Sequence, residues 1–266
     1  MSSVIIIPSR LGSTRLANKA LADINGLSMI ERVIKQCQQA AGSNTFADIF
    51  VATDDETIAQ KSQNCGVQAI MTDSNIKTGT DRIYQALLQI DPKFSKYENI
   101  INVQGDVPNI DPSIIVSALH LLQNVKQADI STACCPCKAE DVLLPNVVKA
   151  VLSFENNLTT PLNNPNIAHA VYFTRNPAPY NANIFYEHIG IYGYRVSSLR
   201  KFVDLPQTSL EKMESLEQLR AIENSMKIFA TITNKKPISI DTPADLEKAR
   251  KLIDPFYNPL FTSLLF

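Results

Sequence analysis

Residues 5–19 of the sequence, IIIPSRLGSTRLANK, bring together side chains that could bind phosphate. An apolar run leads into a stretch that holds three cations, Arg10, Arg15 and Lys19, and the hydroxyl groups of Ser13 and its neighbour. Guanidinium groups and the backbone N–H groups of a turn bind phosphate oxygens well. The segment is therefore a candidate polyphosphate site, although a solvated basic loop is the alternative. It is not a Walker loop, because G-x-x-x-x-G-K-[ST] is absent.

Two aspartates follow apolar runs that are predicted to be strands. Asp106 stands in NVQGDVPNI, residues 102–110, and Asp241 follows Ile238–Ile240. Ligands of an α/β sheet bind beyond the carboxyl ends of its strands, and Mg²⁺ prefers carboxylate and phosphate oxygens. The two aspartates could therefore hold Mg²⁺ against nucleotide phosphates. Asp241 could also support the cap of the helix that begins after Thr242, and the two roles are compatible.

Two weaker signals concern glycine. Gly79 stands between two threonines in KTGTDR, residues 77–82, where a helix is expected to begin. The exposed N–H groups and short hydroxyls of such a segment could bind a base edge or a ribose. The same pattern is also that of an ordinary helix N-terminus. Gly190 and Gly193 interrupt a strand, which indicates a bulge or a close approach of a ligand. His188 beside them could bind substrate or could simply be satisfied by hydrogen bonds.

Short apolar runs alternate with amphipathic segments through the first half of the chain. Strands are expected at residues 4–7, 49–52 and 99–103, and helices at residues 29–41, about 55–65, 81–90 and 112–124. This alternation predicts an α/β fold with a mostly parallel sheet that carries helices on both faces.

The second half of the chain is less regular. Strands are expected at residues 147–154, 168–173, 189–194, 229–232 and 238–240, and loops at residues 156–166 and 176–183. A capping box, Thr208-x-x-Glu211, predicts a helix that runs to about Met226. Thr242 and Pro243 predict the start of a last helix over residues 244–253. Residues 254–266 are apolar and match no motif.

Composition excludes several classes of protein. The 266 residues carry a net charge of −1, which argues against an extended nucleic-acid footprint. No apolar run approaches a membrane span or a signal-peptide core, so we expect a soluble cytoplasmic protein without membrane insertion. The five cysteines, three of them in CCPC at residues 134–137, fit a reduced protein. The Cys134-x-x-Cys137 spacing could suggest a metal, but the end of a buried strand is the simpler interpretation.

Over residues 3–253 the sequence resembles the 3-deoxy-manno-octulosonate (Kdo) cytidylyltransferases, also called CMP-Kdo synthetases. The resemblance rests on seven segments, in order: IPSRLGSTRLANKAL, TDSNIKTGTDR, NVQGDVP, YFTR, HIGIYGYR, SLEKMESLEQLR and IDTPADLEKAR. It implies a Rossmann-like α/β domain of the nucleotide-diphospho-sugar transferase type over residues 1–253. Residues 1–125 would bind mainly CTP, residues 126–235 would bind the sugar and form dimer contacts, and residues 254–266 would be a tail.

The resemblance also implies the reaction and its residues. The anomeric hydroxyl of Kdo would attack the α-phosphate of CTP with Mg²⁺ as cofactor, giving CMP-Kdo and pyrophosphate for lipopolysaccharide biosynthesis. The implied catalytic residues are Arg10, Lys19, Asp106 and Asp241, the two aspartates being the metal ligands. The implied nucleotide-binding residues are Arg10, Ser13, Arg15, Lys19, Thr78, Gly79, Thr80 and Arg82. The implied sugar-binding residues are Gln104, Arg175, His188, Tyr192, Glu217 and Gln218.

The chain departs from the family pattern at a few positions. Ile76 stands where the family usually has His, and Val107 stands where it usually has Glu. These differences leave two alternatives open: a cytidylyltransferase for another 2-keto sugar acid, or a weakened homologue that binds nucleotide. The resemblance implies a homodimer, with Leu210–Leu219 or the strands of the second half as candidate surface.

Overall fold

The computed structural model describes residues 2–13, 15–42, 45–154 and 166–253. The chain forms two compact units. Unit 1 holds the residues up to Glu98, Asn102–Ile115 and the residues from Pro237 onward, and unit 2 holds Asn99–Ile101 and Val116–Lys236. The predicted tail at residues 254–266 and most of the predicted loop at residues 156–166 lie outside the described residues.

Unit 1 is built on parallel strands. β1 (Ser2–Ser9) pairs in parallel with β4 (Asp48–Thr53), which pairs in parallel with β5 (Gln68–Met71). The strand β6 (Tyr97–Val103) and the helix α4 (Pro112–Asn124) belong only in part to this unit, and their other residues are counted with unit 2. Ile5, Ile6 and Ile7 of β1 have no exposed surface, as expected for a parallel strand that is covered on both faces.

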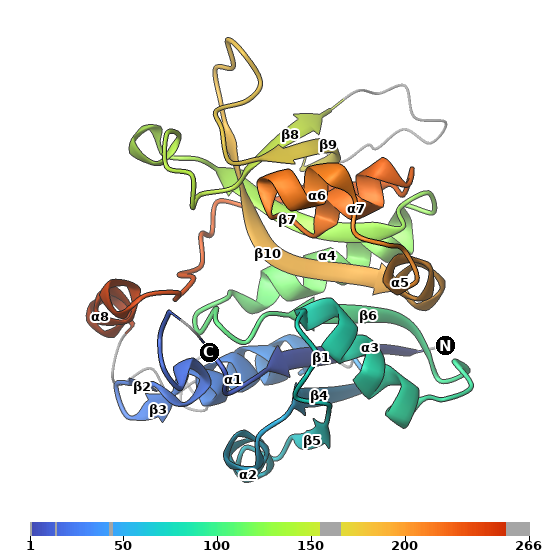
Figure 1. Cartoon of the computed structure of the whole chain (residues 1–266), viewed down its shortest axis with the longest axis vertical. Coiled ribbons are helices and arrows are strands. Elements are labelled where there is room, and N and C mark those ends of the chain that lie inside the picture. Colours follow the sequence, from blue (N-terminus) through green and yellow to red (C-terminus); the bar gives the residue numbers. More distant parts are fainter. Residues whose placement is uncertain (1, 14, 43–44, 155–165, 254–266) are drawn as a thin grey trace. The chain divides into compact units, whose positions relative to one another are not determined.

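Three helices pack on these strands (Figure 1). They are α1 (Met29–Ala41), α2 (Glu56–Asn64) and α3 (Gly79–Ile90). The sequence explains their starts, because Asp55 caps α2 through the N–H groups of Thr57 and Ile58, and Thr78 caps α3 through the N–H group of Asp81. The short elements η1 (Lys19–Leu21), β2 (Asp23–Ile24) and β3 (Leu27–Ser28) lie between β1 and α1.

The last helix, α8 (Pro243–Leu252), belongs to unit 1. Thr242 and Asp245 form its capping box and Pro243 begins it, as predicted. A buried apolar cluster, comprising Ile24, Met29, Ile240, Leu246, Ala249 and Ile253, fixes α8 against the beginning of the chain. The predicted strand at residues 238–240 is wrong, since these residues belong to no strand or helix; the N–H group of Ile240 instead donates to the carbonyl of Asp106 at 3.0 Å.

Unit 2 has a mixed sheet in which most pairs are antiparallel. Its strands are β7 (Ile130–Pro136), β8 (Lys149–Ser153), β9 (Ile167–Thr174), β10 (Tyr186–Arg195) and β11 (Ile228–Ile232). β7 pairs in parallel with β11 but antiparallel with β10, and β9 is antiparallel to both β8 and β11. The mostly parallel sheet expected from the sequence therefore describes unit 1 and not unit 2; the chain as a whole is a mixed α/β fold.

Two sequence predictions about unit 2 need correction. The single helix expected from Thr208 to Met226 is broken into α6 (Ser209–Glu214) and α7 (Gln218–Glu223), because Ser215 adopts a left-handed conformation with φ 52°. The helix α5 (Val196–Val203) and the short η2 (Ala139–Asp141) were not predicted. The bulge expected near Gly190 is confirmed, since the register of β10 against β7 shifts between Ile189 and Tyr192.

Gly193 marks a close approach of protein to protein in unit 2. A Cβ atom there would lie 2.8 Å from Ile101 Cδ1 and 3.0 Å from Leu122 Cδ1, so only glycine fits. The cysteines are free, and Cys134 and Cys135 are buried near the end of β7. Burial, with smaller contributions from Cys135 and Glu187, raises the pKa of Cys134, so its thiol is not reactive, in agreement with the simpler interpretation as a core residue.

Candidate active site

A polar pocket of about 260 Å³ lies in unit 1, at the ends of β1 and β6 and at the N-terminus of α3. Its lining includes most of the predicted phosphate-binding and metal-binding residues. The predicted residues in the lining are Arg10, Ser13, Arg15, Lys19, Thr78, Arg82, Gln104, Asp106 and Asp241. The other lining residues are Pro8, Ser9, Ala20, Lys77 and Gly105. Four segments that are far apart in the sequence thus meet around one cavity, as expected for strand ends at one edge of a sheet.

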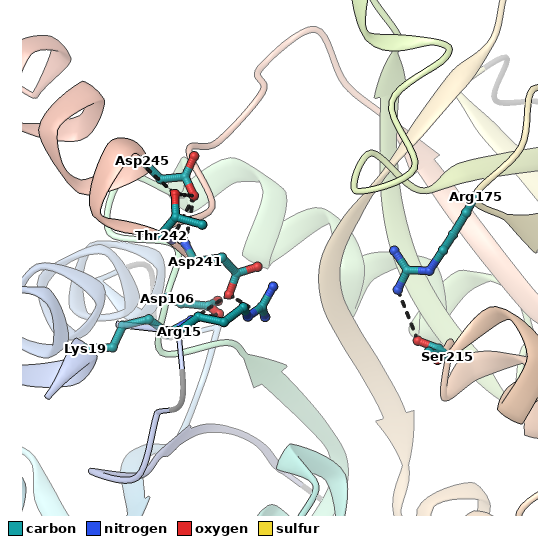
Figure 2. A network of polar contacts seen from close by, with 8 residues as sticks. All are labelled: Arg15, Lys19, Asp106, Arg175, Ser215, Asp241, Thr242 and Asp245. Atoms are coloured by element: carbon teal, nitrogen blue, oxygen red, sulfur yellow. Dashed lines mark hydrogen bonds and ion pairs between the residues drawn. The ribbon is translucent and has the colours of Figure 1, made fainter. Parts of the chain in front are cut away.

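Lys19 stands at the centre of an ionic network in this pocket (Figure 2). Its Nζ atom lies 2.8 Å from Asp106 Oδ2 and 3.0 Å from Asp241 Oδ1. Arg15 reaches the same oxygen of Asp241 at 2.9 Å, with a side chain that is 67% exposed. The predicted meeting of Asp106, Asp241 and two loop cations is therefore observed within one unit.

Local structure holds the two carboxylates in place. Asp106 follows β6, and its carbonyl accepts the N–H group of Ile240, which brings Asp241 beside it. Asp245, in the first turn of α8, accepts the N–H groups of Asp241 and Thr242. Gly105 allows the β6 end to approach β1, because a Cβ atom there would lie 2.8 Å from the carbonyl oxygen of Pro8.

The charge of Lys19 is set by these neighbours. Burial alone would lower the pKa of its ammonium group, but attraction to Asp106 and the hydrogen bonds to Asp106 and Asp241 raise it above the ordinary value. Lys19 is therefore protonated throughout the physiological range. One oxygen of Asp106 and one of Asp241 already lie beside the Lys19 ammonium group. Carboxylate oxygens are also the ligands that Mg²⁺ prefers. The residues present fit a divalent metal completed by phosphate oxygens.

Arg82 lines the pocket, but its guanidinium is bonded to protein. The NH2 group donates to Asp54 Oδ2 at 3.0 Å and to the carbonyl of Ile76 at 3.2 Å, and the side chain is 2% exposed. Ile76 thus contributes through its backbone, which any residue type can supply. Val107 is 4% exposed and packs in the core.

The remaining nucleotide residues lie around the start of α3. Thr78 lines the pocket while capping this helix. Gly79 lies against Gln104, whose Oε1 atom would be 3.3 Å from a Cβ atom added to the glycine. Gln104 donates in turn to Asn102 Oδ1 at 3.0 Å. Thr80 is 1% exposed and does not line the pocket.

Sequence reasoning missed two residues of the pocket. Lys77 adds a fifth cation to its lining; it is the first residue of the segment KTGTDR, in which only the later positions were assigned a role. Ser9 is 6% exposed, and its Oγ atom has no hydrogen-bond partner among the described residues. A buried hydroxyl without a partner is costly, so Ser9 is available to a bound ligand. The sequence gave no sign of this role, because nothing in the pattern around Ser9 shows whether its hydroxyl has a partner in the folded protein.

The predicted sugar-binding residues other than Gln104 belong to unit 2. Arg175 follows β9, and its guanidinium donates to the carbonyls of Pro145, Glu214 and Ser215; Figure 2 shows the contact with Ser215. Its own carbonyl accepts the ammonium of the buried Lys149 at 2.6 Å. The carboxylate of Glu214 also lies here, and it accepts the backbone N–H group of Arg175 at 2.9 Å.

His188 lies in an aromatic cage on β10. Its ring packs against Phe173 and Tyr192 at centroid distances of 4.9 and 5.4 Å. Burial lowers the pKa of His188 to about 4, so the ring is neutral at physiological pH. Its Nε2 atom lies 2.9 Å from Thr132 Oγ1, which donates to the carbonyl of Ile191 at 2.7 Å. Because that hydroxyl has one proton to give, Nε2 is the protonated nitrogen and Nδ1 is the acceptor.

The other predicted sugar-binding side chains are also held by protein. Burial raises the pKa of Tyr192 well above its ordinary value, so it is a neutral phenol. Glu217 and Gln218 begin α7, and Gln218 is 5% exposed. Arg220 lies 3.8 Å from Glu217 and 2.6 Å from Glu211. Within unit 2, Arg175 contacts the end of α6 through Glu214 and Ser215, three residues before α7 begins.

Comparison with known proteins defines the class first. The fold is that of a nucleotidyltransferase, and a cytidylyltransferase family model matches residues 4–228. A relative from Bartonella henselae named 3-deoxy-manno-octulosonate cytidylyltransferase is 44% identical over 254 residues, 95% of this chain and 99% of the relative. A relative of the same name from Rhizobium leguminosarum is 42% identical, covering 94% of each chain. The chain belongs to the 3-deoxy-manno-octulosonate cytidylyltransferase family.

Solved structures agree with this assignment. A CMP:2-keto-3-deoxy-manno-octonic acid synthetase complexed with CTP matches with a TM-score of 0.83 and 34% identity, covering 95% of this chain and 98% of that one. A cytidylyltransferase from Leptospira borgpetersenii, 16% identical with a TM-score of 0.60, shares the fold.

Proposed function

We propose that this protein transfers the cytidylyl group of CTP to Kdo and releases pyrophosphate. The observation that carries the proposal is the pocket in which Arg15, Lys19, Asp106 and Asp241 converge, in a chain of this family. Phosphoryl transfer needs in-line positioning and neutralisation of charge more than covalent catalysis. A cluster that pairs cations with two carboxylates supplies both.

In the reaction the anomeric hydroxyl of Kdo forms a bond to the α-phosphorus of CTP, and the bond to the pyrophosphate oxygen breaks. Arg10, Ser13, Arg15 and Lys19 would bind the triphosphate. Thr78, Gly79 and Thr80 lie at the start of α3, where the positive end of the helix dipole favours polar or anionic groups. The Rossmann-like half of the fold is assigned to unit 1 in this proposal.

Asp106 and Asp241 would hold Mg²⁺. When bound, the metal neutralises phosphate charge and favours the ionised form of the attacking hydroxyl. Lys19, beside both carboxylates, would donate to a phosphate oxygen of CTP. Gln104, Arg175, His188, Tyr192, Glu217 and Gln218 are assigned to the sugar, with Arg175 on its carboxylate and the Nδ1 atom of neutral His188 accepting from a hydroxyl.

The homodimer and the cytoplasmic location stay predictions. The structure supplies exposed apolar side chains in unit 2 that suit a protein contact, Leu143, Val171, Ile184 and Met213 among them. Within the residues that the structure describes, no helix has the length and apolarity needed to cross a bilayer.

The direct test is pyrophosphate release from CTP, measured with and without Kdo and Mg²⁺. We expect release only when all three are present, and loss of release on chelation of the metal. Asp106→Asn should lower kcat/KM by about a thousandfold, because it removes a metal ligand. Glu247→Gln, at a carboxylate that is 61% exposed and paired with Arg250 on the surface, is the control.

Full activity in the presence of a chelator would contradict the metal assignment. If the protein turned over a different 2-keto sugar acid in preference to Kdo, that acid would be its substrate. If calorimetry showed binding of CTP but no turnover occurred, the protein would be a weakened homologue.

A further inference from the structure

We propose that Asp54 is a positioning residue that holds two walls of the nucleotide pocket together, through Arg82 on one side and the backbone of Leu11 on the other. The inference rests on the proposed function, since it concerns how the pocket is kept ready for CTP. Asp54 follows β4 and does not line the pocket itself. Its side chain is 11% exposed.

The two oxygens of Asp54 serve different segments of unit 1. Oδ1 accepts the N–H group of Leu11 at 3.3 Å, and Oδ2 accepts Arg82 NH2 at 3.0 Å. Leu11 lies between Arg10 and Ser13, which both line the pocket, and its carbonyl accepts the N–H group of Ser13 at 2.9 Å. One carboxylate thus anchors the first loop at the place where it leaves β1.

Arg82 connects the same carboxylate to the opposite wall. Besides Asp54, its guanidinium donates to the carbonyl of Ile76 and to Thr72 Oγ1. The hydroxyl of Thr72 donates its own proton to the carbonyl of Thr53 at 3.0 Å, which leaves Oγ1 as an acceptor for Arg82. These bonds fix the segment that leads to Lys77 and Thr78, both of which line the pocket.

The burial of Arg82 decides between two roles. The guanidinium is 2% exposed, and three of its five N–H groups donate to protein, one of them to the Asp54 carboxylate; we therefore assign Arg82 to holding the pocket together. Its contribution therefore passes through the protein. Loss of Asp54 leaves this cation buried without its counter-charge, and both walls lose their common anchor.

The test is Asp54→Asn, whose amide keeps the shape but cannot accept from Arg82 through its nitrogen. We expect the Kd and KM for CTP to rise by about tenfold or more, while the KM for Kdo changes by less than about twofold. Binding of CTP without Kdo is measured by calorimetry, and both KM values by pyrophosphate release. An Asp54→Asn protein that binds CTP as tightly as the wild type would overturn the proposal.

Asp91→Asn is the matched control for a loss of stability. Asp91 is also a buried aspartate of unit 1, 4% exposed, and it accepts the N–H groups of Ser95, Lys96 and Tyr97 at the other end of α3. We expect this variant to melt at a lower temperature with an unchanged KM for CTP. An equal rise in the KM for CTP in both variants would reduce Asp54 to a structural residue and overturn its positioning role.

Thr72→Val keeps the proposal testable if Asp54→Asn does not fold. It removes one acceptor of Arg82 with little change in volume, and we expect CTP to bind about threefold more weakly; unchanged binding would overturn the proposal. Failure of the wild type itself to bind CTP would overturn the proposed function as well, whereas normal wild-type binding with an unchanged variant rejects only the role of Asp54.

Discussion

The two units each contain a lysine placed between two carboxylates. In unit 1, Lys19 lies 2.8 and 3.0 Å from Asp106 and Asp241. In unit 2, Lys236 lies 3.0 and 2.6 Å from Asp141 and Glu187. In both cases burial alone would lower the pKa of the lysine, and the two carboxylates raise it above the ordinary value. As ionic motifs the two clusters are nearly equivalent.

Their surroundings separate them. Lys19 and both of its partners line the polar pocket, where Arg15 adds a further cation, and Lys236 is not among the residues that line it. Lys236 instead ties η2 to β10 within unit 2. A cluster of charges becomes a candidate active site only where it borders space for a ligand and holds charge that the protein has not fully balanced.

The largest expected effect breaks the comparison directly. Lys19→Gln should lower kcat/KM for CTP by about a thousandfold, about 4 kcal/mol, because it removes a cation from the phosphate pocket and leaves two carboxylates facing each other. Lys236→Gln should leave kcat/KM within about threefold and lower the melting temperature. Both are measured by pyrophosphate release and thermal melting. Equal losses of activity in the two variants would contradict the distinction.

A second expected effect tests whether some charged side chains of unit 2 stabilise the fold and take no part in binding CTP. Arg220 and Glu211 form a two-bond ion pair at 2.9 and 2.6 Å between α6 and α7, with both side chains 6% exposed. Glu211→Gln should cost about 3 kcal/mol in the free energy of unfolding, since it leaves a buried guanidinium without its counter-charge. The Kd for CTP should not change. Chemical denaturation measures the first, calorimetry the second, and a weakened affinity for CTP would count against this view.

The smallest expected effect concerns His188 and pH. Its pKa is about 4 in the folded protein, below the ordinary 6.5, because burial disfavours the charged ring. The unfolded chain therefore binds a proton that the folded one does not, and stability falls as pH drops from 6.5 to about 4. His188→Gln should remove about 3 kcal/mol of this acid dependence.

The measurement is the free energy of unfolding at several pH values between 4 and 7. Replacement of the exposed His120 by Gln is the control, and it should leave the pH profile of the wild type in place. If His188→Gln shows the same profile as the wild type, His188 is not the neutral buried group described here.

Much of the fold and of the pocket could be predicted from the sequence, for reasons that are local. Continuous apolar runs such as Val4–Ile7 mark buried parallel strands, and Thr242 with Pro243 marks a helix start. The meeting of Asp106 and Asp241 was predicted from strand ends, although residues 238–240 are not a strand. A single backbone hydrogen bond from Ile240 and the burial of α8 bring Asp241 there instead.

Other features depend on partners that no local pattern reveals. The bond between Asp54 and Arg82 joins positions 28 residues apart, and the acceptors of Arg175 are carbonyl groups that every residue carries. The break between α6 and α7 falls on Ser215, whereas helices that end in a left-handed residue usually have glycine there. The antiparallel pairing of unit 2 depends on where each chain segment returns, which apolar periodicity does not encode.

The position of Asp241 near the end of the chain has a consequence for synthesis. Lys19 and Asp106 are 87 residues apart, whereas Lys19 and Asp241 are 222 residues apart. On a ribosome, the first carboxylate can reach the lysine long before the second, which arrives only with α8. A nascent chain that stops before α8 therefore carries Lys19 and Asp106 without the full pair of carboxylates.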